Sequence, residues 1–428
     1  MSTVISADWV LPVEGAPIER GAVAIEDGRI VAVATIDELG AGEHHPGAAI
    51  VPGFVNAHSH LEYAVYAGFG DGLEFAPWLE LHMARKRRLD GDDMVAIARL
   101  GAAQCLASGI TATGDASFSG AAATAMDELG LRGTVYLEAF GDELADDALR
   151  GRAGSGRIRT GLSPHAPYSA TPALYRACVE TGRPIATHLA ESAAEEEWLV
   201  HGGGPLSSFA HLFPPPLGET GIRALARAGV LGPQIVAAHC VTVDEEEIAL
   251  LAENDVAVAH CPRSNALLGC GIAPLHELRA AGIRVGLGTD SPASTPSFDM
   301  FAELRAAVFA ARARERRPDA LSATEALELA TLGSARALGL GDEVGSLVPG
   351  KHADLAVVSL DDSPYVPWED PAAAVVFGGS PQSVTTTLVD GEARYERGGF
   401  RWQELKRSAT SARSRMLAAS GPVAASPR

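Results

Sequence analysis

Short strand-like runs alternate with longer helical segments through the middle of the chain. Eight such runs lie at residues 51–60, 109–113, 133–137, 158–162, 184–188, 235–239, 256–260 and 284–290. The segments between them carry a helical pattern, as in Asp92 to Ser108 and Asp244 to Glu253. Strands that alternate with helices predict a parallel sheet covered by helices. Eight β/α units over about 290 residues predict an α/β fold, a (β/α)8 TIM-type barrel, at residues 51–343.

The two ends of the chain show a different pattern. Residues 1–50 contain short strand-like runs, and Asp27-Gly28 between two of them is a hairpin turn signal. Residues 344–405 hold similar runs. Neither end has enough residues for a core of its own, so we expect both to pair into one small β-sandwich domain. Residues 406–428, rich in Ser and Ala with scattered Arg, predict a C-terminal tail that is helical in part and disordered at its end.

The composition narrows the classes of partner. The 428 residues carry a net charge of −20, from 54 acidic against 34 basic side chains. This balance argues against nucleic acid and anionic membranes as partners, because both are bound through basic surfaces. No apolar stretch reaches the roughly 20 residues that span a bilayer, and no secretion signal is visible. The five cysteines are scattered without CxxC pairs, which favours a reduced, cytoplasmic setting. We expect a small-molecule substrate and consider a homodimer, which is common for such barrels.

Several of the predicted strands end on histidine or aspartate. The first ends on His58-Ser59-His60, and because side chains alternate between the faces of a strand, His58 and His60 point the same way. Later runs end on His188, His239 and Asp290. Barrel enzymes hold their chemistry at the C-terminal ends of the strands. Imidazole suits zinc or iron, and a carboxylate completes such a set, so the pattern predicts a metal site.

Five motifs make the chain resemble the amidohydrolase superfamily nearly from end to end. They are residues 51–60 (VPGFVNAHSH), His188-Leu189-Ala190-Glu191, His239-Cys240, His260-Cys261-Pro262-Arg263-Ser264-Asn265 and Gly288-Thr289-Asp290-Ser291. The segment Pro349 to Leu355 looks like the family's return into its β domain. The fourth strand ends in Ser163-Pro164-His165, without the bridging lysine of many binuclear members. The resemblance is therefore to the mononuclear branch of chlorohydrolases and purine or cytosine deaminases.

This resemblance implies a metal-dependent enzyme with a defined set of ligands. It implies one divalent metal per subunit, with zinc favoured over iron. The implied ligands are His58, His60, His188 and Asp290. Asp290 would also accept a hydrogen bond from the attacking water. His239 would face that water and help to deprotonate it, with a fifth-ligand role as the alternative.

Three further residues take roles from the resemblance. Glu191 looks like the HxxE glutamate that protonates a ring nitrogen in deaminases of this branch, although it could instead be the solvated start of an acidic helix. His165 resembles a substrate-contacting residue of nucleoside deaminases, against a structural role in a turn. For His260, a pocket role and a structural role beside the Cys-Pro turn both stay open.

The implied reaction is hydrolytic deamination of an adenine-type nucleoside with release of ammonia. In methylthioadenosine and adenosylhomocysteine deaminases, a glutamate downstream of a Trp-Leu-x-x-His stretch binds the ribose diol. Here Trp78-Leu79-Glu80-Leu81-His82 is present, but an ungapped match puts Arg87 at that glutamate's position. This departure weakens that reading.

The segments around His58, His188 and His260 look closer to aminodeoxyfutalosine deaminases, which act in a menaquinone pathway. The substrate of these enzymes carries an aryl carboxylate, which Arg87 in the basic run Arg85 to Arg88 could bind, unless this run is a solvated helix face. Aminodeoxyfutalosine is therefore the predicted substrate. A chlorohydrolase, an amidase, and a guanine or cytosine deaminase remain alternatives. A non-catalytic assembly protein would be expected to lose ligands, whereas this chain keeps all four.

Overall fold

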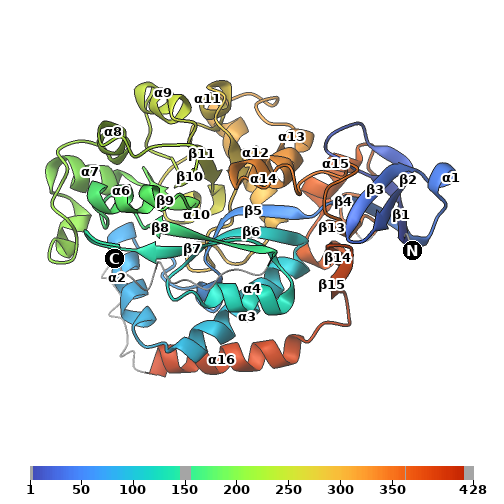
Figure 1. Cartoon of the computed structure of the whole chain (residues 1–428), viewed down its shortest axis with the longest axis horizontal. Coiled ribbons are helices and arrows are strands. Elements are labelled where there is room, and N and C mark those ends of the chain that lie inside the picture. The colour runs from blue at the N-terminus through green and yellow to red at the C-terminus, as the bar shows by residue number, and fades with distance from the viewer. Residues whose placement is uncertain (1–2, 145–155, 362, 419–428) are drawn as a thin grey trace.

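The centre of the protein is an eight-stranded parallel sheet closed into a barrel (Figure 1). The computed structural model describes residues 3–144, 156–361 and 363–418. The barrel strands are β5 (Phe54–Ser59), β6 (Ile110–Ser117), β7 (Arg132–Ala139), β8 (Ile158–Pro164), β9 (Ile185–Leu189), β10 (Ile235–His239), β11 (Ala257–His260) and β12 (Val285–Leu287). The barrel closes where the Asp290 backbone N–H donates to the His58 carbonyl at 3.0 Å. Each predicted strand is present within a few residues, and the predicted fold class is confirmed.

Helices surround the barrel and connect its strands (Figure 1). They are α2 (Phe75–Lys86), α3 (Gly91–Ala107), α4 (Ala121–Leu129), α6 (Pro172–Glu180), α7 (Ala193–His201), α8 (Gly221–Arg227), α9 (Glu245–Glu253), α10 (Pro262–Leu267), α11 (Leu275–Ala280), α12 (Met300–Glu315), α13 (Ala323–Glu328) and α14 (Ser334–Ala337). Side chains fix where these helices begin: Asp90 caps α3 and Asp244 caps α9, each in a reciprocal capping box with the residue three positions on. Short 3-10 or π turns lie at Leu61–Tyr63, Pro205–Phe209, Leu329–Gly333, Ala374–Gly378 and Pro381–Ser383.

Strands from both chain ends form a second sheet beside the barrel. They are β1 (Thr3–Val10), β2 (Ile18–Glu26), β3 (Arg29–Thr35), β4 (Glu43–Pro52), β13 (Leu355–Ser359), β14 (Val384–Val389) and β15 (Glu392–Glu396), with the short helices α1 (Ile36–Leu39) and α15 (Pro371–Ala373) at the sides. The two ends meet where β13 pairs antiparallel with β4, Leu355 opposite Pro52. Asp27 and Gly28, both at positive φ, turn β2 into β3 as predicted. Since β4 ends one residue before β5 begins, this sheet anchors the strand that carries His58 and His60.

The C-terminal residues contain the helix that was expected in part of the tail. Residues 402–418 form one long helix, α16 (Trp402–Ala418), which packs along α3 (Figure 1). Its buried positions are Leu405, Ala409, Ala412 and Met416, an apolar stripe at helical spacing. Arg415 also forms an ion pair with the buried Asp93 of α3. The helical part of the predicted tail is thus present over residues 406–418, which pack onto the barrel's outer layer, while residues 419–428, for which disorder was expected, lie outside the described residues.

Among the described residues, no helix has both the length and the apolar character needed to cross a membrane.

Candidate active site

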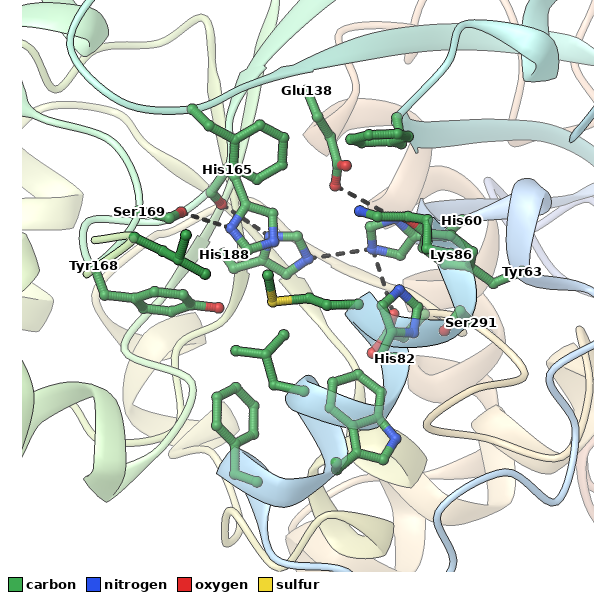
Figure 2. Close-up of a pocket in the computed structure, with 18 of the residues that line it drawn as sticks. His60, Tyr63, His82, Lys86, Glu138, His165, Tyr168, Ser169, His188 and Ser291 are labelled. Atoms are coloured by element: carbon green, nitrogen blue, oxygen red, sulfur yellow. Dashed lines mark hydrogen bonds and ion pairs between the residues drawn. The ribbon is translucent and has the colours of Figure 1, made fainter. Parts of the chain in front are cut away.

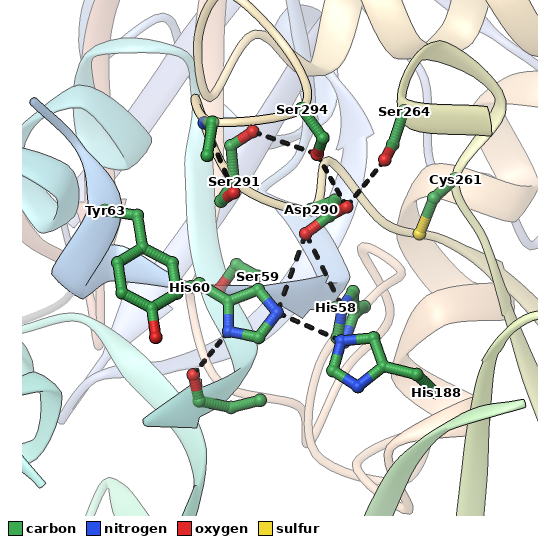
Figure 3. A network of polar contacts seen from close by, with 12 residues as sticks. His58, Ser59, His60, Tyr63, His188, Cys261, Ser264, Asp290, Ser291 and Ser294 are labelled. Carbon is green, nitrogen blue, oxygen red and sulfur yellow. Dashed lines mark hydrogen bonds and ion pairs between the residues drawn. The ribbon is translucent and has the colours of Figure 1, made fainter. Parts of the chain in front are cut away.

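Three histidines meet at the C-terminal end of the barrel. His58 and His60 come from β5 and its end, and His188 comes from β9. One ring nitrogen of each lies within 4.8 Å of the other two, and all three residues are buried (Figure 3). The Nε2 atoms of His60 and His188 are 3.2 Å apart. Alternation along β5 and the parallel alignment of β5 and β9 therefore produce the cluster that the sequence predicted.

Backbone carbonyls fix the orientation of two of these rings. Nδ1 of His60 donates to the carbonyl of Ala116 at 2.8 Å, and Nδ1 of His188 donates to the carbonyl of His165 at 2.9 Å. Each Nε2 then carries a lone pair directed into the cluster. Nε2 of His58 is buried and has no hydrogen-bond partner among the described residues. Burial lowers the pKa of His60 to about 3, so its imidazole is neutral at physiological pH. Three neutral, convergent imidazoles fit a divalent metal ion.

Asp290 adds a carboxylate to this cluster. It follows β12, and its Oδ1 lies 3.6 Å from Nε2 of His60 and 3.8 Å from Nε2 of His58. Its Oδ2 accepts hydrogen bonds from the hydroxyls of Ser264, at 2.6 Å, and Ser294, at 2.7 Å (Figure 3). Burial opposes ionisation of Asp290, but His58 and His60 outweigh it and hold its pKa below the usual range. One oxygen is thus held by hydroxyls while the other, ionised oxygen faces the histidines.

The backbone turns sharply where the strands deliver these side chains. Ala190, His239, Cys240 and Asp290 all adopt positive φ, between 47° and 77°. Non-glycine residues adopt this left-handed region infrequently, and it is common at functional sites where the surrounding structure over-determines the backbone. The turns lie at the ends of β9, β10 and β12, and they direct side chains from three strands to one centre.

Glu191 and His239 lie beside the cluster. Oε1 of Glu191 is 3.7 Å from Nε2 of His239, and both side chains are buried. Nδ1 of His239 donates to the side-chain Oδ1 of Asn265 at 2.9 Å, while its Nε2 has no partner in the described part of the chain. Burial raises the pKa of Glu191 to about 7. Because Glu191 is 5% exposed, the alternative of a solvated helix start is wrong.

Glu195 holds Glu191 in place. Its carboxylate accepts the backbone N–H of Ala190 at 3.1 Å and that of Glu191 at 2.8 Å. Burial raises the pKa of Glu195 to about 8. Glu195 therefore fixes the turn that follows His188, a function that the sequence pattern did not reveal.

A cavity of about 450 Å³ opens from this cluster, and His60, His188, Glu191 and Asp290 are among the residues that line it. Figure 2 shows His60 and His188 in its wall. His165 also lines it, with Nδ1 2.8 Å from the hydroxyl of Ser169. Aromatic side chains make up much of the remaining wall; they are Tyr63, Phe75, Trp78, Phe118, Phe140, Tyr168 and Phe213. Such a wall suits a flat ring, and the few polar groups of the lining can fix its orientation.

Two charged residues of this cavity had no role of their own assigned from the sequence. Glu138 lies at the end of β7, and Oε1 of its carboxylate is 3.9 Å from Nδ1 of His60. Lys86 is the last residue of α2; its Nζ lies 3.8 Å from the ring centre of Phe118 and donates to Tyr63 Oη at 3.4 Å. Burial raises the pKa of Glu138 to about 7, against the opposing effect of Lys86.

The basic run around Lys86 points in several directions. Arg87 lines the cavity edge and is exposed. The Arg85 guanidinium stacks on Phe69, 4.3 Å from the ring centre, and Arg88 donates to the Met416 carbonyl of α16. Neither Arg85 nor Arg88 is among the residues that line the cavity.

His260 lies apart from this cavity. It lines a second one, together with Arg263, Asn265 and Phe309. Its Nδ1 is buried without a hydrogen-bond partner among the described residues, and burial lowers its pKa to about 4. Because His260 lies outside the main cavity, this placement favours the structural role over a role in that pocket.

Known proteins resemble the chain over nearly all of its length. The amidohydrolase family model matches residues 49–394. The 5-methylthioadenosine/S-adenosylhomocysteine deaminase of Moorella thermoacetica is 34% identical, over 91% of this chain and 93% of that protein. The 5'-deoxyadenosine deaminase of Methanothermobacter thermautotrophicus is also 34% identical, over 91% of this chain and 92% of that protein.

Two solved structures extend this comparison. A zinc-bound adenosine deaminase from Xanthomonas campestris superposes with a TM-score of 0.88 at 29% identity, over 97% of this chain and 98% of that one. A zinc complex of atrazine chlorohydrolase from Arthrobacter aurescens gives 0.80 at 25% identity, over 97% and 100%. Both of these structures hold zinc.

Proposed function

The chain belongs to the amidohydrolase family and is a hydrolytic deaminase of the adenosine type, and from this premise we propose how its residues act and which substrate they select. The family assignment agrees with the motifs that the sequence displays. The observation that carries the catalytic proposal is the position of Glu191, a buried carboxyl group between the histidine cluster and the cavity.

We assign His58, His60, His188 and Asp290 as the ligands of one divalent metal ion, with zinc as the preferred metal. Two observations support the assignment: the imidazoles converge in neutral form, and a buried carboxylate oxygen faces them. A bound zinc ion is a Lewis acid that brings the pKa of water close to 7. The second contacts of His60, His188 and Asp290 keep these ligand atoms directed inward.

Glu191 and His239 then handle protons on either side of the reaction. His239 Nε2 accepts a proton from the attacking water, whose oxygen bonds to the amino-bearing ring carbon. Protonated Glu191 donates to the ring nitrogen next to that carbon, which its pKa of about 7 allows near neutral pH. The amino group accepts the proton held by His239, the carbon–nitrogen bond breaks, and ammonia leaves. The hydroxyl proton left on the ring carbon returns to Glu191 as the carbonyl forms. His165 contacts the ring from the cavity wall.

For the substrate, we propose aminodeoxyfutalosine, which would place the protein in a menaquinone pathway. The aromatic wall suits an aryl group, and the ammonium of Lys86 lies within that wall, against Phe118. We therefore assign recognition of the aryl carboxylate to Lys86 first, with Arg87 at the cavity edge as a second cation. Lysine binds carboxylates as a compact charge with three donors, only one of which is directed to Tyr63 here.

A 5'-thioether or 5'-deoxy adenine nucleoside is the second candidate. It is supported by the names of the two relatives from Moorella and Methanothermobacter. The apolar side chains of Met83, Leu79 and Phe213 in the cavity wall suit such a substituent. The basic residues Lys86 and Arg87 in the part of α2 that borders the cavity favour the anionic substrate over it.

A substrate panel tests these proposals. Zinc-loaded protein is assayed for ammonia release from aminodeoxyfutalosine, methylthioadenosine, adenosylhomocysteine, 5'-deoxyadenosine, adenosine, guanine, cytosine and a chlorotriazine. We expect aminodeoxyfutalosine to have the highest kcat/KM. A methylthioadenosine preference would support the second candidate, and chloride release from the triazine alone would reject the deaminase mechanism for this site. Glu191→Gln serves as the control, because it should retain zinc without turnover.

A further inference from the structure

Glu138 carries a buried oxygen without a partner inside the cavity. Its side chain is 2% exposed, and its Oε2 has no hydrogen-bond donor among the described residues. Its other oxygen, Oε1, faces Nδ1 of His60 at 3.9 Å, but that N–H already donates to the Ala116 carbonyl at 2.8 Å. The ammonium of Lys86 attracts Glu138 from the same region yet donates to Tyr63. The protein itself therefore leaves this acceptor unsatisfied.

An unpaired buried carboxyl oxygen is costly, and in native structures such groups are completed by a ligand, an ion or an ordered water. Figure 2 shows Glu138 directed into the cavity between His165 and Lys86. From this placement, and on the premise that the substrate is an adenine nucleoside, we infer that Glu138 accepts a hydrogen bond from a hydroxyl group of the substrate's sugar. Glu138 is then a specificity-determining residue, separate from the groups that carry out the proton transfers.

The hydrogen-bonding chemistry of a nucleoside favours the sugar as the donor. The adenine ring presents acceptor nitrogens, and its exocyclic amino group, its one strong donor, is the group that leaves. The accepting oxygen of Glu138 therefore finds its donors on the ribose hydroxyls. Glu138 enters from β7, whereas Glu191 follows β9 and is held by Glu195. Glu138 thus lies on a different wall from the acid assigned to the ring.

The test compares adenosine with 2'-deoxyadenosine and 3'-deoxyadenosine on the full-length, zinc-loaded protein. For the native protein, removal of the contacted hydroxyl should lower kcat/KM roughly 10- to 100-fold, since it deletes a hydrogen bond to a charged acceptor. In Glu138→Ala, kcat/KM for adenosine should fall by a similar factor. The ratio of kcat/KM between adenosine and that deoxy analogue should then shrink to about 3-fold or less. The near-isosteric Glu138→Gln should have a kcat/KM for adenosine between those of the native protein and Glu138→Ala.

Zinc content and circular dichroism accompany these rates. Glu180→Gln at the exposed end of α6 is the matched control and should retain both activity and discrimination. Equal discrimination in the native protein and in both Glu138 variants would overturn the inference, and the ring amino group would then be the donor left to examine. Loss of zinc from Glu138→Gln would also overturn the inference, because it would mean that Glu138 supports the metal ligand His60. If the native protein deaminates none of the adenine nucleosides, the proposed function fails first and this inference with it.

Discussion

Glu191 Oε1 lies 3.7 Å from His239 Nε2, and both groups are closed off from bulk solvent beside the histidine cluster. The described group of ligand atoms comprises His58, His60 and His188, while Glu191 lines the cavity beside it. A weak acid and a weak base at this separation can serve the two proton transfers of a hydrolytic deamination. Their environments set them apart: burial raises the pKa of Glu191 and lowers that of His239.

Glu191→Gln should retain zinc and lower kcat by roughly 10²- to 10⁴-fold, because the amide keeps the shape of the side chain but cannot donate the proton. Zinc content by elemental analysis and ammonia release check both parts. Conservative replacement of Glu196, the acidic neighbour in the first turn of α7, by Gln provides the control and should leave kcat unchanged. Normal turnover in Glu191→Gln would remove this residue from the mechanism.

The same carboxyl group predicts a pH dependence. Glu191 must be protonated to donate, and burial raises its pKa to about 7. The protonated fraction is nearly complete below that value and declines as pH rises through it, so kcat/KM should fall on the basic side. The profile is measured between roughly pH 5 and pH 9. A basic limb that persists unchanged in the residual activity of Glu191→Gln would belong to another group.

Asp290→Asn should weaken zinc binding and abolish most turnover, because the amide presents no negative charge to the ion. Ser264→Ala tests the outer contact: it deletes one of the two hydroxyls that hold Oδ2 of Asp290 and should lower zinc affinity about 10- to 100-fold. Competition with a chelator measures both affinities. Unchanged affinity in Asp290→Asn would reject its assignment as a ligand.

The fold and the histidine cluster could be predicted because they depend on local periodicity. Alternation places His58 and His60 on one face, and parallel strands bring His188 to the same end of the barrel. Glu138 was missed for a small geometric reason. The predicted third strand ended at residue 137, whereas β7 continues to Ala139, so its strand-end carboxylate was not recognised.

Residues whose role depends on helix packing were harder to predict. The ungapped match selected Arg87, but the direction of each basic side chain depends on how α2 lies against the barrel, since successive residues differ by about 100° around a helix. Lys86 therefore lies against Phe118, while Arg88 contacts α16. The packing of α16 itself depends on two alanines, a leucine and a methionine in a stretch dominated by Ser, Ala and Arg, which gave little apolar signal.

Lys86→Met should lower kcat/KM for aminodeoxyfutalosine about 10-fold or more. It should change kcat/KM for adenosine less than about 3-fold, because adenosine carries no anionic group. Arg87→Met is the comparison variant, since Arg87 is the second cation assigned to the anion, at the exposed cavity edge. If Arg87→Met shows the larger selective loss, the sequence-based choice is restored and Lys86 is a wall residue. Equal losses for both substrates in Lys86→Met would remove it from anion recognition.

Met416→Ala tests whether α16 is an integral layer of the fold. Met416 is 1% exposed and belongs to the core cluster that includes residues of α3. Truncating a buried methionine leaves a cavity and should lower the free energy of unfolding by roughly 2–5 kcal/mol. The neighbouring Arg415→Ala breaks the ion pair with Asp93. Because the Arg415 side chain is 56% exposed, this change should lower the free energy of unfolding by less than Met416→Ala does. Thermal unfolding followed by circular dichroism ranks the variants against the native protein. Because α16 lies outside the cavity lining, kcat/KM should stay unchanged at temperatures where both variants are folded. If Met416→Ala leaves the unfolding temperature unchanged, α16 is not coupled to the barrel.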